Sequence, residues 1–311
     1  MPGYFRLYTV IMRYRRLGCT NLRVSVIGLG TWQFGGEWGR DFSQPEVDAI
    51  FDAARSVGIN LIDTAECYGD HLSETLIGRA IQRDRADWVV CTKFGHVFTG
   101  RFRRDEPRSP VDVIGQLDRS LVALRTDFVD VLQYHSWGDG QFFDDDVLAA
   151  LLKARDAGKF RHLGNSVRGK EYEKQVAASR DRQGPGVQLV YNPPHRPPEA
   201  KPPPPCPPNC RRQDWGVLAR SPLARGWLSG KSRPGHKFPP TDTRSRGKGL
   251  VEGEQRHADF RQACSEVPAG VNMATWALAW CLNHPAVSAV IPGCKDAEQV
   301  RANAAAGESS E

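Results

Sequence analysis

The sequence lacks an apolar run of the roughly 20 residues that are needed to cross a membrane. Residues 1–11 also lack the apolar stretch of a secretory signal. The 42 Lys and Arg residues and the 36 Asp and Glu residues are scattered, without long blocks of one sign. The densest basic cluster, Arg101, Arg103 and Arg104, is too short for a nucleic-acid surface and indicates a solvated loop. We therefore predict a cytoplasmic protein with neither a membrane nor a nucleic acid as its partner.

The eight cysteines lack any regular spacing. Cys91 and Cys281 fall within an expected strand and an expected helix, where a thiol packs like a small apolar side chain in a reducing compartment. Cys206 and Cys210 lie close together, but no second Cys/His pair has the spacing of a zinc site. The sequence therefore predicts no metal.

Apolar runs alternate with segments of helical periodicity along most of the 311 residues. Strands are expected at 26–32, 59–62, 88–91, 128–134, 160–166, 187–192, 215–220 and 286–291. Helices are expected at 43–58, 73–80, 110–124, 145–157, 170–179 and 273–283 and after 296, and a hairpin at 15–25. This alternation predicts an α/β fold with parallel strands and helical crossovers. Eight such units close into a barrel, and a doubly wound open sheet is the alternative.

Ionisable residues follow the ends of three successive expected strands. Asp63 ends the second strand, with Tyr68 in the loop after it, while Lys93 and His135 end the next two. The carboxyl ends of parallel strands are where α/β folds build their sites, so these four side chains are expected to converge. Taken singly, each has an ordinary surface or packing role, and only their joint order favours a site.

These four residue types can polarise and protonate a carbonyl group. A nearby ammonium lowers the pKa of a tyrosine, and a carboxylate holds that ammonium in place. Tyr68 could then donate a proton to an oxygen that gains negative charge, with Lys93 and Asp63 behind it. A neutral imidazole at His135 could donate a hydrogen bond to the same oxygen.

The motifs around these residues resemble those of the aldo-keto reductases. They are Asp63-Thr64-Ala65-Glu66-Cys67-Tyr68-Gly69 with Ser73-Glu74 and Gly78, then Thr92-Lys93-Phe94-Gly95, then Gln133-Tyr134-His135-Ser136. The resemblance runs from about Tyr14 to Ala305 and implies a single domain, residues 1–311, folded as a (β/α)8 TIM barrel. It also implies that Asp63, Tyr68, Lys93 and His135 are the catalytic tetrad, with Tyr68 as the general acid.

The resemblance further implies a bound NADPH/NADP+ and places its contacts. Ser221 to Lys231 is similar to the family's pyrophosphate loop, and Lys295 is expected beside the 2′-phosphate. Tyr191 is expected to stack on the nicotinamide, with Ser166 and Gln188 at its carboxamide, although Val167 replaces the usual Asn partner. The full expected set is Gly30, Thr31, Trp32, Ser166, Gln188, Tyr191, Ser221, Pro222, Leu223, Gly226, Lys231, Ile291, Gly293, Lys295, Gln299 and Asn303.

One stretch departs from the family pattern. Ten of the sixteen residues 193–208 are proline, where the family has a helix after the sixth strand. Each interior proline costs an α-helix about 3 kcal/mol, so we expect an irregular segment over 193–210 and a disrupted sixth helix beside uncovered apolar surface. Residues 1–11 are expected to be a disordered extension, and 232–256 a mobile loop.

The resulting prediction is an enzyme that reduces a small aldehyde or ketone with NADPH. Two alternatives stay open. One is a non-catalytic NADP-binding regulatory subunit of the same fold, similar to the channel-associated members of the family. The other is an impaired protein, because of the proline-rich segment. The sequence indicates neither the identity of the carbonyl substrate nor the oligomeric state.

Overall fold

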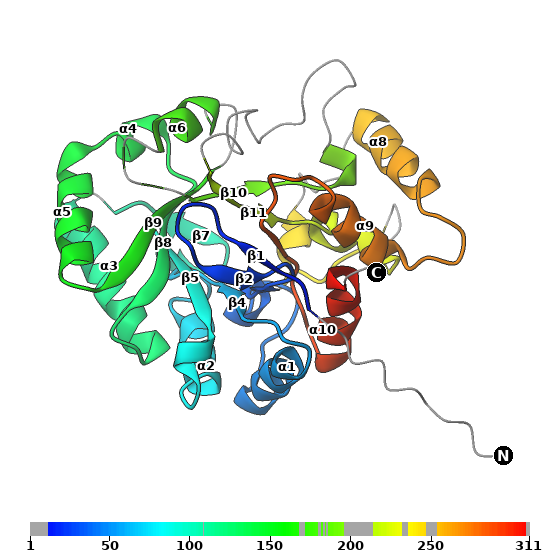
Figure 1. The fold of residues 1–311 in the computed structure, drawn as a ribbon, viewed down its shortest axis with the longest axis horizontal. Helices are drawn as coiled ribbons and strands as arrows, with labels where there is room; N and C mark the ends of the chain where they lie inside the picture. The colour runs from blue at the N-terminus through cyan, green and yellow to red at the C-terminus, as the bar shows by residue number, and fades with distance from the viewer. Residues whose placement is uncertain are drawn as a thin grey trace.

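The computed structural model describes residues 12–107, 109–167, 172–179, 182, 184, 186–195, 214–231, 236–246 and 254–308. Its central sheet has eight parallel strands in the order β12-β11-β10-β9-β8-β5-β4-β3. Their bounds are β3 Leu29–Gly30, β4 Leu61–Asp63, β5 Val89–Phe94, β8 Val129–His135, β9 Phe160–Ser166, β10 Gly186–Val190, β11 Gly216–Arg220 and β12 Ala289–Ile291. Parallel bridges from Ile27 to Val290 and from Gly30 to Gly293 join the first strand to the last. The predicted (β/α)8 barrel is confirmed (Figure 1).

Helices surround the sheet and cover its outer face (Figure 1). They are α1 Gln44–Ser56, α2 Leu72–Ala80, α3 Pro110–Leu124, α4 Asp139–Phe142, α5 Asp145–Asp156, α6 Tyr172–Ser179, α8 Glu254–Ser265, α9 Met273–Leu282 and α10 Ala297–Ala304. Local signals set their ends: α1 begins with a capping box between Ser43 and Glu46 and stops before Gly58, whose φ is 74°. α3 begins at Pro110 after the capping side chain of Ser109.

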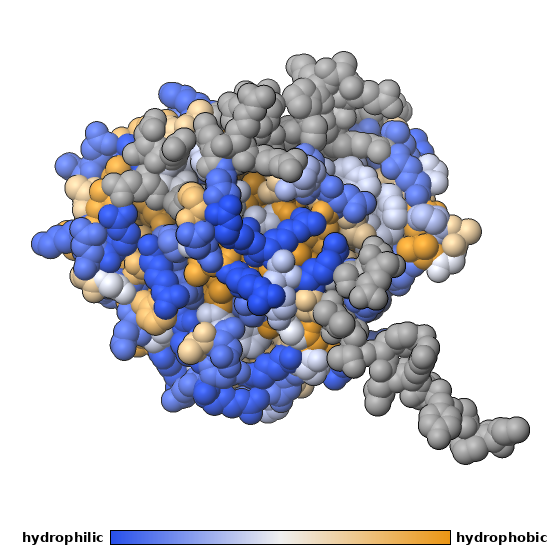
Figure 2. Space-filling view, viewed as in Figure 1, coloured by the Kyte–Doolittle hydropathy of each residue, from blue (hydrophilic) through white to orange (hydrophobic). Residues whose placement is uncertain are grey.

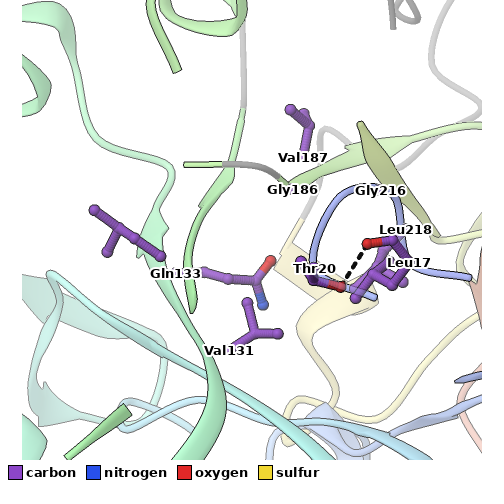
Figure 3. A pocket seen from close by; sticks show the side chains of 9 residues that line it. Leu17, Thr20, Val131, Gln133, Gly186, Val187, Gly216 and Leu218 are labelled. Atoms are coloured by element: carbon purple, nitrogen blue, oxygen red, sulfur yellow. Dashed lines mark hydrogen bonds between the residues drawn. The ribbon is translucent and has the colours of Figure 1, made fainter. Parts of the chain in front are cut away.

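An antiparallel hairpin, β1 (Tyr14–Arg16) and β2 (Arg23–Ser25), closes the amino-terminal end of the barrel, as expected. Gly18 touches the start of β11 so closely that a Cβ there would lie 2.1 Å from the Gly216 nitrogen. The cavity left between hairpin and strands measures about 10 Å³, and Gln133 points into it from β8 (Figure 3). A space of that size holds about one water molecule. Any larger ligand must therefore enter from the opposite end, where the strands finish.

The face that carries the hairpin is mostly hydrophilic, with hydrophobic side chains in small separate areas (Figure 2). Among the helices of the described ranges, none combines the length and apolar character needed to span a bilayer.

The expected mobile loop at 232–256 was wrong for its described parts. Residues 236–246 fold back onto the first loop of the barrel, where Asp242 pairs with Trp38 in an antiparallel bridge. The backbone nitrogen of Thr243 also donates to the Glu37 carbonyl, and α8 already begins at Glu254. The polar composition of this segment gave no indication that Asp242 would be buried. Asp242 accepts a hydrogen bond from the guanidinium of Arg244.

The proline-rich segment is described only in part. A short 3-10 helix, η3 (Pro193–His195), follows β10 and contacts α8 and α9. Residues 196–213 lie outside the described residues, and with them the predicted disruption of the sixth helix. The predicted extension at 1–11 lies outside them as well.

Candidate active site

The ends of neighbouring strands bring Asp63, Lys93 and Tyr68 together. β4 and β5 pair with Asp63 opposite Cys91, which places Lys93 just beyond Asp63 at the end of the barrel where the strands finish. The Lys93 Nζ donates to Asp63 Oδ2 at 2.8 Å and to the Thr64 carbonyl at 2.7 Å, and it lies 3.4 Å from the Tyr68 hydroxyl oxygen. The structure thus forms a continuous polar chain from a carboxylate through an ammonium to a phenol.

Burial controls the ionisation of this chain. It lowers the pKa of Lys93, but the charges and hydrogen bonds of Asp63 and Tyr68 together more than compensate, so that pKa is raised overall. It raises the pKa of Tyr68, and this outweighs the opposite effect of the ammonium. The expectation that Lys93 would lower the pKa of Tyr68 overall was wrong, because it omitted the loss of hydration. Tyr68 keeps its proton at neutral pH, as a proton donor must.

Two of the expected carboxamide contacts lie beside Asp63 inside the barrel. Gln188 on β10 donates through Nε2 to Asp63 Oδ1, and its Oε1 accepts from the Ser166 hydroxyl on β9 at 3.1 Å. Gln133 Nε2 on β8 lies 3.4 Å from the same Asp63 oxygen. Side chains from β8 and β10 therefore contact the carboxylate that holds Lys93, and Ser166 on β9 holds Gln188 in turn.

His135 joins the site from the end of β8, with its ring edge-on to Tyr68 at a centroid distance of 6.0 Å. Its Nδ1 lies 3.6 Å from the Cys67 sulfur and 3.7 Å from Glu66 Oε2. The His96 ring is 4.6 Å from the His135 ring. Burial raises the pKa of Glu66 and that of the Cys67 thiol. Sequence reasoning missed Glu66, Cys67 and His96 as site residues, although two of them lie within the motif that carries Tyr68.

Trp32 forms one wall of the site and stacks on Tyr68 with ring centroids 6.1 Å apart. Its Nε1 donates a hydrogen bond to Glu37, which is 2% exposed. Glu37 also accepts hydrogen bonds from the Phe102 backbone nitrogen and from Arg104 Nη2, each at 2.7 Å. Phe102 and Arg104 belong to the hairpin of β6 (Val97–Gly100) and β7 (Arg103–Asp105), which the sequence did not predict. Arg104 is therefore the partly buried ion-pair partner of a buried carboxylate, and the interpretation of its cluster as wholly solvated was wrong.

The first and last strands meet closely at the expected cofactor loop. A Cβ on Gly30 would lie 2.6 Å from the Ile291 carbonyl oxygen, and one on Gly293 would lie 3.0 Å from Gln33 Oε1. Thr31, buried beside them, donates its hydroxyl to the Asp63 carbonyl. Glycine at position 30 lets the strand ends approach each other this closely, whereas a side chain at 293 would require Gln33 to shift.

The segment after β11 turns sharply through Ser221, Pro222 and Leu223 into the 3-10 helix η4 (Ala224–Ser229). Ser221, Arg225 and Gly226 have φ of 54°, 57° and 92°. Arg225 lies over the Trp32 ring at 5.8 Å, and its buried Nε lacks a hydrogen-bond acceptor among the described residues. An unmatched buried donor in a tightly turned loop suits an anionic oxygen. Lys231 is exposed at the end of this loop.

A cavity of about 470 Å³ opens beside the start of α10. It is lined by Arg40, Glu46, Ala49, Lys295, Asp296, Ala297 and Gln299. Burial lowers the pKa of Lys295, and the charge of Arg244 lowers it further. Gln299 Oε1 accepts from the Lys295 backbone nitrogen, and Asn303 binds the Cys294 sulfur. The structure thus brings two of the expected adenosine contacts, Lys295 and Gln299, together at this cavity and adds Arg40, which the sequence did not indicate.

The structure does not bring Tyr191 to the other expected contacts. Its ring packs on Trp280 at 5.0 Å and on His284 at 5.7 Å, both in the helical layer at α9. Side chains alternate along a strand, and Gln188 three residues earlier points inward, so Tyr191 points outward. Arg220 at the end of β11 instead reaches across to the Val167 carbonyl at the end of β9.

Comparisons with known proteins agree with this arrangement. The uncharacterized oxidoreductase YqkF of Bacillus subtilis is 29% identical over 94% of this chain and 90% of its own length. A probable voltage-gated potassium channel subunit beta of Oryza sativa is 31% identical over the same shares. The aldo-keto reductase AKR11C1 of Bacillus halodurans, in its holo form, superposes with a TM-score of 0.79 at 26% identity, covering 96% of this chain and 92% of that one. The profile described as the Aldo/keto reductase family matches residues 26–310, so this chain belongs to the aldo/keto reductase family.

Proposed function

We propose that the protein reduces a small aldehyde or ketone to an alcohol, with NADPH as the hydride donor and Tyr68 as the general acid. The observation that carries this proposal is the chain from the buried Asp63 and Lys93 to the partly buried Tyr68, with its 2.8 Å and 3.4 Å contacts. A bound NADPH supplies the hydride to the carbonyl carbon. The oxygen then gains negative charge beside the Tyr68 hydroxyl, which passes its proton to it.

Each neighbour of Tyr68 has a separate task in that step. Lys93 places a positive charge beside the phenolate that remains, and Asp63 keeps Lys93 charged and in position. His135 turns Nδ1 towards Glu66 and Cys67, which leaves Nε2 as the nitrogen for the carbonyl oxygen. A hydrogen bond from Nε2–H would stabilise the developing negative charge.

The loop and cavity chemistry fits a dinucleotide. The turned segment from Ser221 to Gly226, with the unmatched Arg225 Nε, suits the pyrophosphate. Lys295 and Arg40 line one cavity, and although Arg40 is paired with Glu46 at 2.7 Å, the Lys295 ammonium favours a 2′-phosphate there over a free hydroxyl. The holo form of the Bacillus halodurans relative also supports a bound cofactor. We therefore favour NADPH over NADH as the cofactor. We also propose a cytoplasmic location, where that cofactor is present in its reduced form.

Replacing Tyr68 with Phe tests the proposal, because the change removes only the hydroxyl. We expect turnover with a panel of aromatic and aliphatic aldehydes to fall by about 10²–10⁴-fold, as for the loss of a general acid. NADPH should still quench tryptophan fluorescence in Tyr68→Phe as it does in the wild type. Unchanged turnover in this variant would remove Tyr68 from the mechanism.

A second candidate function is a non-catalytic, cofactor-binding regulatory subunit. It is favoured by the 31% identity to the probable potassium channel subunit beta of Oryza sativa. NADPH binding without turnover of any carbonyl in the panel, in the wild type as in Tyr68→Phe, would support this alternative. Measurable turnover in the wild type would reject it.

A further inference from the structure

Three metal-ligating atoms from two separate loops meet on the side of His135 that faces away from its proposed carbonyl contact. Glu66 and Cys67 follow β4, and His135 ends β8, 68 residues further along from Cys67. The Glu66 carboxylate oxygen, the Cys67 sulfur and the His135 ring nitrogen all lie within 4.8 Å of one another. We propose that Glu66, Cys67 and His135 form a site for a divalent cation of the zinc class. This inference concerns ion binding alone and does not depend on carbonyl reduction.

The spacing of the three atoms matches a tetrahedral zinc ion. With zinc–ligand distances of about 2.3 Å to sulfur and about 2.0 Å to nitrogen or oxygen, tetrahedral edges measure about 3.5 Å and about 3.3 Å. The Cys67 sulfur lies 3.6 Å and Glu66 Oε2 lies 3.7 Å from His135 Nδ1. These two edges exceed the tetrahedral values by a few tenths of an ångström, and the third, from the Cys67 sulfur to the Glu66 carboxylate, lies within 4.8 Å.

Glu66 provides the second, independent observation. Its side chain is 2% exposed, and Oε1 accepts a hydrogen bond from the His96 backbone nitrogen at 2.8 Å. Its Oε2 is buried and lacks a hydrogen-bond partner within the described part of the chain. A buried carboxylate oxygen without a donor is unfavourable, so it calls for an explanation such as a bound ion. Coordination to a cation would satisfy this oxygen at the point where it faces Cys67 and His135.

The charges around the three ligands permit a cation there. Lys93 is paired with Asp63 at 2.8 Å and Arg104 with Glu37 at 2.7 Å; Arg104 also hydrogen-bonds the Cys67 side chain and gives up that contact when the ion binds. When zinc binds, the Cys67 thiol proton is released to solvent and the resulting thiolate offsets part of the ionic charge. A thiolate with an imidazole selects zinc or cobalt over magnesium or calcium, which prefer oxygen ligands. The fourth position falls to water.

Cobalt(II) provides a direct test, because a thiolate ligand adds a sulfur-to-cobalt charge-transfer absorption to its spectrum. We expect the full-length protein to bind one Co²⁺ with this absorption, and Zn²⁺ but not Mg²⁺ to displace it. Cys67→Ala should lose the absorption, and Glu66→Gln should weaken Co²⁺ binding at least 10-fold. Cys264→Ala, which removes a half-buried thiol on α8, is the matched control and should bind as the wild type does.

The proposal is overturned if the wild type shows no sulfur-to-cobalt absorption, a result that needs no variant to fold. It is equally overturned if the absorption survives in Cys67→Ala, because the ion would then sit on other cysteines, such as Cys206 and Cys210. Circular dichroism of Cys67→Ala and Glu66→Gln checks that both variants keep the fold.

Discussion

The two halves of the proposed site are built differently. Asp63 and Lys93 are nearly enclosed, with Tyr68 partly buried beside them, and the polar atoms around Asp63 and Lys93 are paired with partners from other strands. The cofactor half uses loops and the start of α10, where Lys231 is exposed and the cations of Arg40 and Lys295 face an open cavity. A buried, paired group combines structural and chemical roles, whereas an exposed cation can change with little effect on the fold.

The variant Lys93→Met should have the largest effect and tests the buried half of the site directly. The change leaves Asp63 buried with its charge unpaired, which should reduce the free energy of unfolding by about 3–5 kcal/mol. It should also abolish turnover, because no positive charge remains beside Tyr68. Urea unfolding followed by circular dichroism measures the first effect. A loss of turnover at unchanged stability would contradict the combined role of this side chain.

Two arginines of one short basic cluster differ in burial: Arg104 is partly buried against Glu37, whereas Arg101 is exposed. Arg104→Ala leaves Glu37 buried without its ion-pair partner, so we expect a loss of about 3 kcal/mol in unfolding free energy. Arg101, 43% exposed and 3.5 Å from Asp41, should change it by less than about 0.5 kcal/mol when replaced by Ala. Equal urea midpoints for the two variants would show that the ion pair of Arg104 and Glu37 contributes no more to the unfolding free energy than the exposed contact of Arg101 does.

Lys295→Ala addresses the cofactor half. It removes one cation from the cavity beside α10, so NADPH should bind about 10-fold more weakly, equivalent to about 1.4 kcal/mol. NADH, which lacks the 2′-phosphate, should bind as before, and the unfolding free energy should stay within about 0.5 kcal/mol. Fluorescence titration with both cofactors distinguishes the outcomes. An equal loss for NADH would place Lys295 elsewhere on the dinucleotide.

The smallest predicted effect is a pH dependence from His71 on the loop before α2. Burial lowers its pKa, but the hydrogen bond and charge of Glu74, and then the charges of Glu66 and Asp70, raise it overall. A raised pKa in the folded state stabilises the protein below the unfolded pKa of about 6.5. That stabilisation disappears as the pH rises through the folded pKa.

The urea midpoint should therefore fall from pH 6 to alkaline pH more steeply in the wild type than in His71→Gln. Parallel curves for the two proteins would exclude this histidine as the cause.

Much of the barrel and of its candidate active site could be predicted from local sequence. The capping Ser109 with Pro110 begins α3 at the predicted residue, and Gly58 ends α1, because these signals act within a few residues. Asp63, Lys93 and His135 follow buried strands, so the periodicity of those strands predicts that their side chains converge. The structure brings them together as expected, while their catalytic roles remain proposals.

Other parts depended on contacts between distant residues. Nothing near Arg104 in the sequence points to Glu37, 67 residues away, and nothing near Cys67 points to His135. The outward direction of Tyr191 followed from the pleat of β10, which the family motif did not reveal.

The sequence by itself therefore determined the order of strands and helices and the identity of the groups at the strand ends, because hydrophobic period and capping are local properties. Only the tertiary structure decided which polar groups are buried together. That pairing determines the pKa of Tyr68, the unmatched oxygen of Glu66 and the charge of Lys93, since loss of water and the distance between charges exist only after the barrel closes.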